Sequence, residues 1–136
     1  RRLVDFREIP IFVEGRTEED VRFLKQIASA LSHKVLEATS EQRRNLHLAA
    51  VFTCNFTNHM YALAERLLQK HDLPFDVLLP LIDETARKVH ELSPRLAQTA
   101  VRYDTGVMDK HLDMLADEPE MQQLYRLLSD DIHRLA

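Results

Sequence analysis

Residues 39–70 read TSEQRRNLHLAAVFTCNFTNHMYALAERLLQK, and this stretch decides the fold. Thr39 and Gln42, three residues apart, are typical of a capping box, which predicts that a helix starts here. No residue between Asn45 and Ala64 carries a formal charge. The last turn, ending at Lys70, is charged again, as suits the end of a helix dipole. The stretch therefore predicts one long helix with an uncharged middle.

The apolar residues of this helix fall on more than one side. One stripe recurs at spacings of three and four, and a second follows another side of the helix; they comprise Leu46, Ala50, Thr53, Thr57, Met60, Ala64 and Leu67, and Leu48, Phe52, Phe56 and Leu63. A helix that is apolar on several sides is normally buried on several sides. We therefore expect it to be the buried central post of a helical domain.

Polar side chains interrupt this apolar surface. His47, Cys54 and Asn58 lie seven and four residues apart, which in an α-helix places them within about 20° of one another. Asn55 lies at the edge of the same face, and Arg43 extends it by one turn. Two interpretations remain open: core polar residues bonded to adjacent helices, or one polar wall of a substrate cleft. Cys54 itself is expected to be a small buried hydrophobic residue.

Composition narrows the class of protein. The chain has 136 residues, of which 45% are hydrophobic and 29% are charged, as in one soluble globular domain. A net charge of −4 without a Lys/Arg run argues against nucleic-acid binding. One cysteine excludes an internal disulfide and fits a cytoplasmic location. The polar residues of the long stretch argue against a membrane span, and the seven dispersed histidines predict no metal site.

Glycine is scarce, with only Gly15 and Gly106 in the whole chain. A dinucleotide-binding loop and a P-loop each need a cluster of glycines, so neither can be built from these residues. If a nucleotide takes part, its phosphates must be held by another segment or another chain.

Residues 1–38 predict a strand, a helix and a second strand. Residues 9–13 are rich in β-formers and Gly15 ends them, Thr17 caps a helix with an acidic first turn, and residues 33–37 form the second strand. Such a unit belongs to a parallel sheet, and two strands are too few to stand alone. We therefore expect residues 1–38 to be the edge of a larger sheet and the chain to be the C-terminal part of a longer protein.

Residues 39–136 predict a helical domain. Beyond the long helix, residues 75–92 form an amphipathic helix that Pro80 either kinks or begins. Residues 94–103 are irregular, Asp104 or Thr105 caps a short helix that runs to Leu115, and Asp117 and Pro119 start the last helix. The fold class is thus mainly α, preceded by a short βαβ edge.

Three motifs carry a resemblance that covers nearly the whole chain. They are LHLAAVF with CNF and NH in the long helix, LPLIDET in the next, and RYD with HLDML after the loop. Together they resemble the C-terminal helical domain, of unknown function, that follows a Rossmann NADP-binding domain in bacterial oxidoreductases. Such domains are similar to the C-terminal domain of pyrroline-5-carboxylate reductase and to the 6-phosphogluconate dehydrogenase C-terminal-like superfamily.

The resemblance implies hydride transfer from NADP to a small carbonyl or imine, with His47 and Asn55 as catalytic residues. It implies that the substrate-binding residues are Asn58, Thr99, Arg102, Asp104 and His111. From the residues alone, an Arg102–Asp104 pair that fixes its loop and a structural His111 remain alternatives. The chain departs from the family where Thr99 is followed directly by Ala100, whereas members typically carry Gly-Pro between these positions.

The resemblance also implies that NADP is bound mainly by a preceding domain, so that this chain alone is expected to be inactive. An apolar helix of this kind in a small domain predicts a homodimer through helices. A non-catalytic helical dimerisation module is the alternative function, because one fold can host both.

Overall fold

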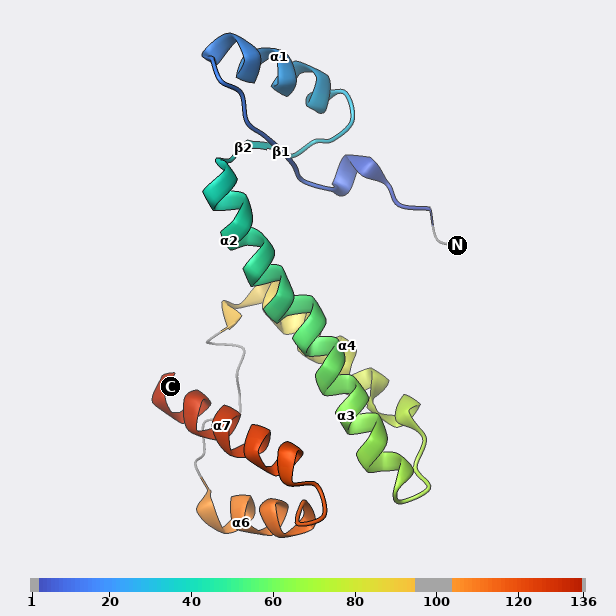
Figure 1. The fold of residues 1–136 in the computed structure, drawn as a ribbon. Helices are drawn as coiled ribbons and strands as arrows, with labels where there is room; N and C mark the ends of the chain where they lie inside the picture. The colour runs from blue at the N-terminus through green and yellow to red at the C-terminus, as the bar shows by residue number, and fades with distance from the viewer. Residues whose placement is uncertain (1–2, 95–103, 136) are drawn as a thin grey trace. The chain divides into compact units, whose positions relative to one another are not determined.

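The computed structural model describes residues 3–94 and 104–135 and is mainly helical, with one two-stranded parallel sheet (Figure 1). The chain divides into two compact units, Arg1–Met60 and Tyr61–Ala136. The mainly α fold class with a short βαβ edge is confirmed. The predicted domain boundary, between residues 38 and 39, lies between the second strand and the long helix and stays a prediction.

The first unit opens with the predicted strand, helix and strand. After the 3-10 turn η1 (Phe6–Glu8) come β1 (Ile11–Val13), α1 (Glu18–Ser29) and β2 (Val35–Glu37). The strands pair in parallel, with Ile11 opposite Val35, and α1 packs against both. Each strand begins two residues later than predicted. At β1 the reason is Pro10, which has no N–H to donate to a sheet.

The core of this unit is small and lies at the ends of these elements. Val13, Ala28 and Ala38 are buried, and the Ser32 hydroxyl donates to the Ile9 carbonyl at 2.5 Å while accepting from the Lys34 N–H at 3.0 Å. A buried hydroxyl needs such partners. Ser32 therefore ties together the two segments that lead into the strands.

The long helix runs through α2 (Ser40–Ala50), the π-helical segment η2 (Val51–Phe56) and α3 (Thr57–Gln69). Its predicted capping box is present, because Thr39 Oγ1 accepts from the Gln42 N–H at 3.2 Å and Gln42 Oε1 from the Thr39 N–H at 2.8 Å. The predicted buried post is wrong for the described chain: none of the three segments contains a buried residue.

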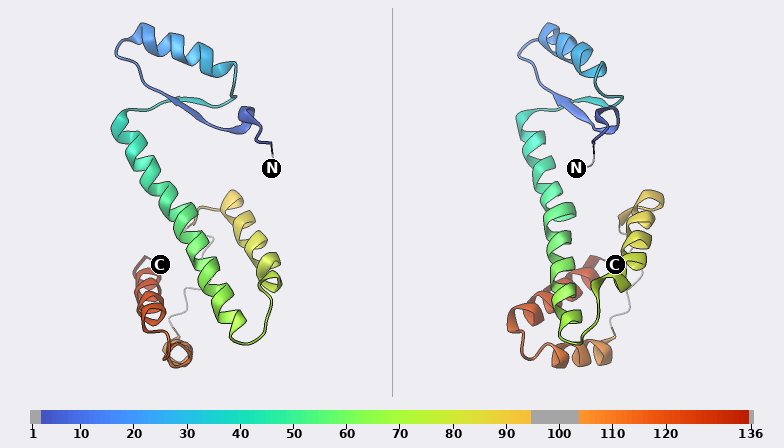
Figure 2. Two further views of the ribbon diagram at one scale, coloured as in Figure 1. Left: turned by 45° about the vertical axis from the view of Figure 1, so that its right-hand side comes forward. Right: turned by 90° about the vertical axis from the view of Figure 1, so that its right-hand side faces the viewer.

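The second unit holds the remaining helices. After α3, the backbone of Asp72 is left-handed, with φ of 55°. The elements that follow are η3 (Phe75–Leu78), α4 (Leu79–Glu91), α6 (Thr105–Met114) and α7 (Pro119–Leu135). Pro80 lies in the first turn of α4, so it begins that helix and does not kink it. Figure 2 shows the short connection between α6 and α7. Leu112, Leu115 and Met121, at this hairpin, are buried.

None of the helices in the described residues is long and apolar enough to cross a membrane.

Candidate functional site

The π-helical segment η2 contains Asn55 and begins four residues after His47, the two catalytic residues that the resemblance implies. A π-helix bonds each N–H to the carbonyl five residues earlier, so it holds one residue more per turn than an α-helix and is often found at functional sites. The Thr57 hydroxyl also reaches back five residues and donates to the Phe52 carbonyl at 3.3 Å. Neither Gly nor Pro occurs in η2, and no residue pattern predicted it.

The extra residue changes which polar side chains share a face. It rotates the positions beyond it back by about 100° relative to an α-helix. Asn55 lies inside η2, so the angle of about 80° that an α-helix would give between His47 and Asn55 does not apply. His47 and Asn58 move from about 20° to about 80° apart. The α-helical face predicted for His47 and Asn58 is therefore interrupted by η2.

These polar residues are not part of a bonded core. His47, Asn55 and Asn58 are all exposed, and within the described part of the chain no hydrogen bond holds their side chains. Hydrogen bonding to adjacent helices therefore does not account for them. Cys54, expected to be buried, is exposed as well, and its Sγ lies 3.7 Å from Thr53 Oγ1.

The same stretch carries exposed apolar side chains. Leu46, Leu48, Phe52 and Phe56 are 46%, 56%, 61% and 48% exposed, and the two phenyl rings meet edge to face at 5.0 Å. These four side chains are exposed among the described residues, although the apolar pattern predicts their burial.

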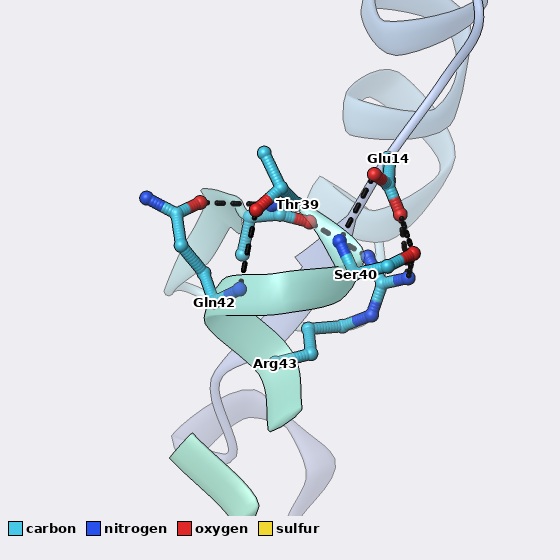
Figure 3. A network of polar contacts seen from close by, with 6 residues as sticks. Glu14, Thr39, Ser40, Gln42 and Arg43 are labelled. Atoms are coloured by element: carbon cyan, nitrogen blue, oxygen red, sulfur yellow. Dashed lines mark hydrogen bonds and ion pairs between the residues drawn. The ribbon is translucent and has the colours of Figure 1, made fainter. Parts of the chain in front are cut away.

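A polar network around Glu14 holds the start of α2 (Figure 3). Glu14, directly after β1, accepts from the Ser40 N–H at 3.0 Å, from the Ser40 hydroxyl at 2.7 Å and from Arg43 Nη2 at 2.6 Å. Arg43 Nη1 also donates to the Ala38 carbonyl at 2.6 Å. The hydrogen bonds from Ser40 and Arg43 lower the pKa of the Glu14 carboxyl. Arg43, predicted to extend the polar face, instead anchors the helix that carries His47.

The predicted substrate-binding residues of the second unit are described only in part. Thr99 and Arg102 lie outside the described residues, as does the departure at Ala100. Asp104 is the N-cap of α6, and its Oδ1 accepts from the Val107 N–H at 3.1 Å. This carboxylate therefore has a structural role at the helix start.

His111 lies beside a cavity in the second unit. Its Nδ1 is 2.9 Å from the hydroxyl of Tyr125, and the two rings meet edge to face at 5.7 Å. The cavity holds about 570 Å³. Most of its wall is apolar and comes from Leu67, Leu68, Met114 and Leu115. Sequence reasoning did not select Tyr125, which reads as part of the apolar face of the last helix.

Ion pairs hold the end of α3 to the α6–α7 connection beside this cavity. Lys70 Nζ is 2.8 Å from carboxylate oxygens of Asp117 and Glu118, and Arg66 lies at the same distance from Glu118. The hydrogen bonds to Asp117 and Glu118 raise the pKa of Lys70, and Lys70 lowers the pKa of Asp117. No spacing rule could predict these pairs, because their partners are 47 or more residues apart.

The turn between β1 and α1 does not fit the phosphates of a dinucleotide. Such phosphates need glycine-rich backbone and the positive end of a helix. Here Gly15 stands without other glycines, and the first turn of α1 carries Glu18, Glu19 and Asp20, whose charges would repel an anion. Among the described residues, no group of three or more His, Cys, Asp or Glu could hold a metal ion.

Comparison with known proteins places these features in context. The family described as "Domain of unknown function (DUF2520)" matches residues 9–132. A solved structure from Bacteroides fragilis, described as a "putative NADP oxidoreductase", is 67% identical, with a TM-score of 0.88. The match covers 98% of this chain and 52% of that chain, so this chain spans about half the length of its relative. No curated protein matches the sequence.

Proposed function

Because this chain belongs to the DUF2520 family of domains of unknown function, we propose that it is the helical part of an NADP-dependent oxidoreductase. Its role would be to bind a small carbonyl or imine substrate for hydride transfer. One observation carries the proposal: the 67% identity, over 98% of this chain, to the Bacteroides fragilis protein described as a "putative NADP oxidoreductase". The βαβ edge that leads directly into the long helix agrees with this role.

We assign the chemistry of the chain to His47 and Asn55. Reduction of a carbonyl or imine by hydride leaves negative charge on oxygen or nitrogen, and a nearby acid must supply a proton. An imidazole can do so near neutral pH, so His47 would be the proton donor. Asn55 lies further along the same helix, within η2, and its amide would hold the substrate. The Glu14 network would keep this helix in place.

In this proposal the cofactor is held outside the chain. The acidic first turn of α1 and the lack of a glycine cluster speak against a phosphate site among these residues. The match leaves about half of the relative's length uncovered, and that half is long enough to hold a phosphate site. The 136-residue chain alone is then expected to bind no NADPH.

Homodimerisation through the long helix is the second part of the proposal. Phe52 and Phe56, side by side and 61% and 48% exposed, form an apolar surface of the kind that a partner helix covers. The same surface favours the alternative function, a non-catalytic dimerisation module.

The proposal is tested with the full-length protein that contains this chain. NADPH fluorescence titration should give saturable binding by the full-length protein and none by the 136-residue chain. His47→Ala and Asn55→Ala should lower turnover of small carbonyl and imine acids by about 100-fold or more, with NADPH affinity and unfolding midpoint unchanged. His90→Ala, on α4, is the matched control. Absence of NADPH binding by the full-length protein would refute the oxidoreductase assignment.

Dimerisation is tested separately by light scattering of the 136-residue chain at micromolar concentration. Phe52→Glu should dissociate the dimer, because it places a charge in an apolar contact. Phe23→Glu, on α1, is the matched control because Phe23 is also 61% exposed. A monomeric wild-type chain would contradict this part of the proposal.

A further inference from the structure

The cavity beside His111 has the dimensions and lining of a small-molecule site. Its volume of about 570 Å³ lies within the range of ligand pockets, roughly 300–1,000 Å³. Apolar side chains make most of the wall, and the polar groups are few: the His111–Tyr125 pair, the exposed His71, and Lys70. Such a lining suits a molecule with an apolar body and one polar group.

Charge balance disfavours an anionic head group in this cavity. Lys70, the cation at the cavity, already pairs with two carboxylates, those of Asp117 and Glu118. Its charge is therefore neutralised from within the unit. An anionic ligand would have to compete with both carboxylates for this ammonium group.

The His111–Tyr125 pair offers a hydrogen to a ligand in either tautomer. If Tyr125 donates to Nδ1, the histidine hydrogen is on Nε2; if Nδ1 donates to the tyrosine oxygen, the hydroxyl hydrogen remains free. One polar hydrogen is thus left over in each arrangement. A natural partner of a donor in a mainly apolar wall is an uncharged acceptor, such as a carbonyl oxygen.

We propose that this cavity binds an uncharged, mainly apolar molecule whose carbonyl oxygen accepts a hydrogen bond from the His111–Tyr125 pair. The ion pairs of Lys70 and Arg66 with the α6–α7 connection keep the two walls together. The inference does not depend on hydride transfer or on NADP. It would hold equally in a protein that binds such a ligand without changing it.

The test compares two probes on the 136-residue chain by equilibrium dialysis. One is the naphthalene ketone Prodan, and the other is its analogue with a methylene in place of the carbonyl. Both should bind at one saturable site, the ketone more tightly by about fivefold, as one extra hydrogen bond predicts. In the double variant His111→Leu/Tyr125→Phe both probes should bind alike. Tyr61→Phe, the same chemical change away from the cavity, should leave the preference intact.

A cavity-filling variant checks the location of the bound probe. Leu68→Trp should abolish binding of both probes, and Met114→Trp serves if the first variant fails to fold, because Met114 is 72% exposed and tolerates a larger side chain. Binding that survives these variants, or equal affinity of wild type for the two probes, would overturn the proposal. So would a wild-type dimer that binds neither probe and that Met114→Trp dissociates, because a second copy of the chain would then cover the cavity.

Discussion

Replacing Gly15 by alanine should destabilise the first unit. A Cβ added there would lie 2.7 Å from the Cβ of Asp20, 2.8 Å from the Val21 nitrogen and 3.0 Å from Val21 Cγ2. Asp20 cannot retreat easily, because it exchanges two hydrogen bonds of 3.1 Å with Thr17 in the capping box of α1. The backbone of Val21 belongs to the same helical turn. The added methyl group must therefore disturb the strand-to-helix turn.

The size of the effect follows from two opposing contributions. Overpacking costs about 1–3 kcal/mol, whereas alanine restricts the unfolded chain and returns about 0.4–1 kcal/mol. The net loss in the free energy of unfolding should be about 1–2 kcal/mol. Since small proteins have urea m-values of about 1–3 kcal/mol per M, the midpoint should fall by roughly 0.5–1 M.

Gly106→Ala is the matched control and should have the opposite sign. Gly106 lies in the first turn of α6, where the nearest atom to an added Cβ is Asp104 Oδ1 at 3.5 Å, an ordinary contact. Alanine is the better helix former by about 0.5–1 kcal/mol. Urea unfolding followed by far-ultraviolet circular dichroism measures both variants. A Gly15→Ala protein as stable as wild type, at an unchanged m-value, would refute the steric argument.

Two further outcomes follow from the polar contacts. The pKa of the Glu14 carboxyl is lowered in the folded protein. The ionised carboxylate therefore stabilises the fold at pH values above 4.5, the ordinary pKa of glutamate. This stabilisation is lost as the pH falls through the lowered pKa of the folded protein. Glu14→Gln should thus be less stable than wild type at pH 7 but equally stable in strong acid. Urea unfolding midpoints measured across this pH range test the prediction. A difference in stability that does not change with pH would argue against the ionised contact. Asp104→Ala should cost about 1 kcal/mol as a lost helix cap, and Asp104→Asn much less. If both variants keep full stability in urea, Asp104 does not act as a cap.

Much of the local structure could be predicted from the sequence. The Thr39–Gln42 capping box, the acidic start of α1 after Thr17, and Pro80 in the first turn of α4 are short-range patterns. Each depends on residues within one turn, whose preferences do not need the rest of the fold. The parallel pairing of β1 with β2 could also be predicted, because two strands joined by a helix usually pair in parallel.

The candidate site could be predicted less well, because its geometry depends on contacts beyond one turn. The predicted positions of His47 and Asn55 assume a helix with 3.6 residues per turn. The π-helical segment η2 does not have this geometry, and its sequence contains no Gly or Pro that would have predicted the change. His111 was selected, but its partner Tyr125 lies across the α6–α7 connection, 14 residues away. Only the packing of those two helices joins them.

By itself, the sequence determined which segments are helical and where the capped ones begin, since capping and periodicity are local properties of the chain. Tertiary structure alone decided what those faces meet. The apolar stripes of the long helix, which predicted a buried post, are exposed at Leu48 and Phe52, because a hydrophobic pattern states that a surface favours burial but not which surface will cover it. The ion pairs of Lys70 and the cavity beside His111 were likewise decided by folding, which brings distant residues together.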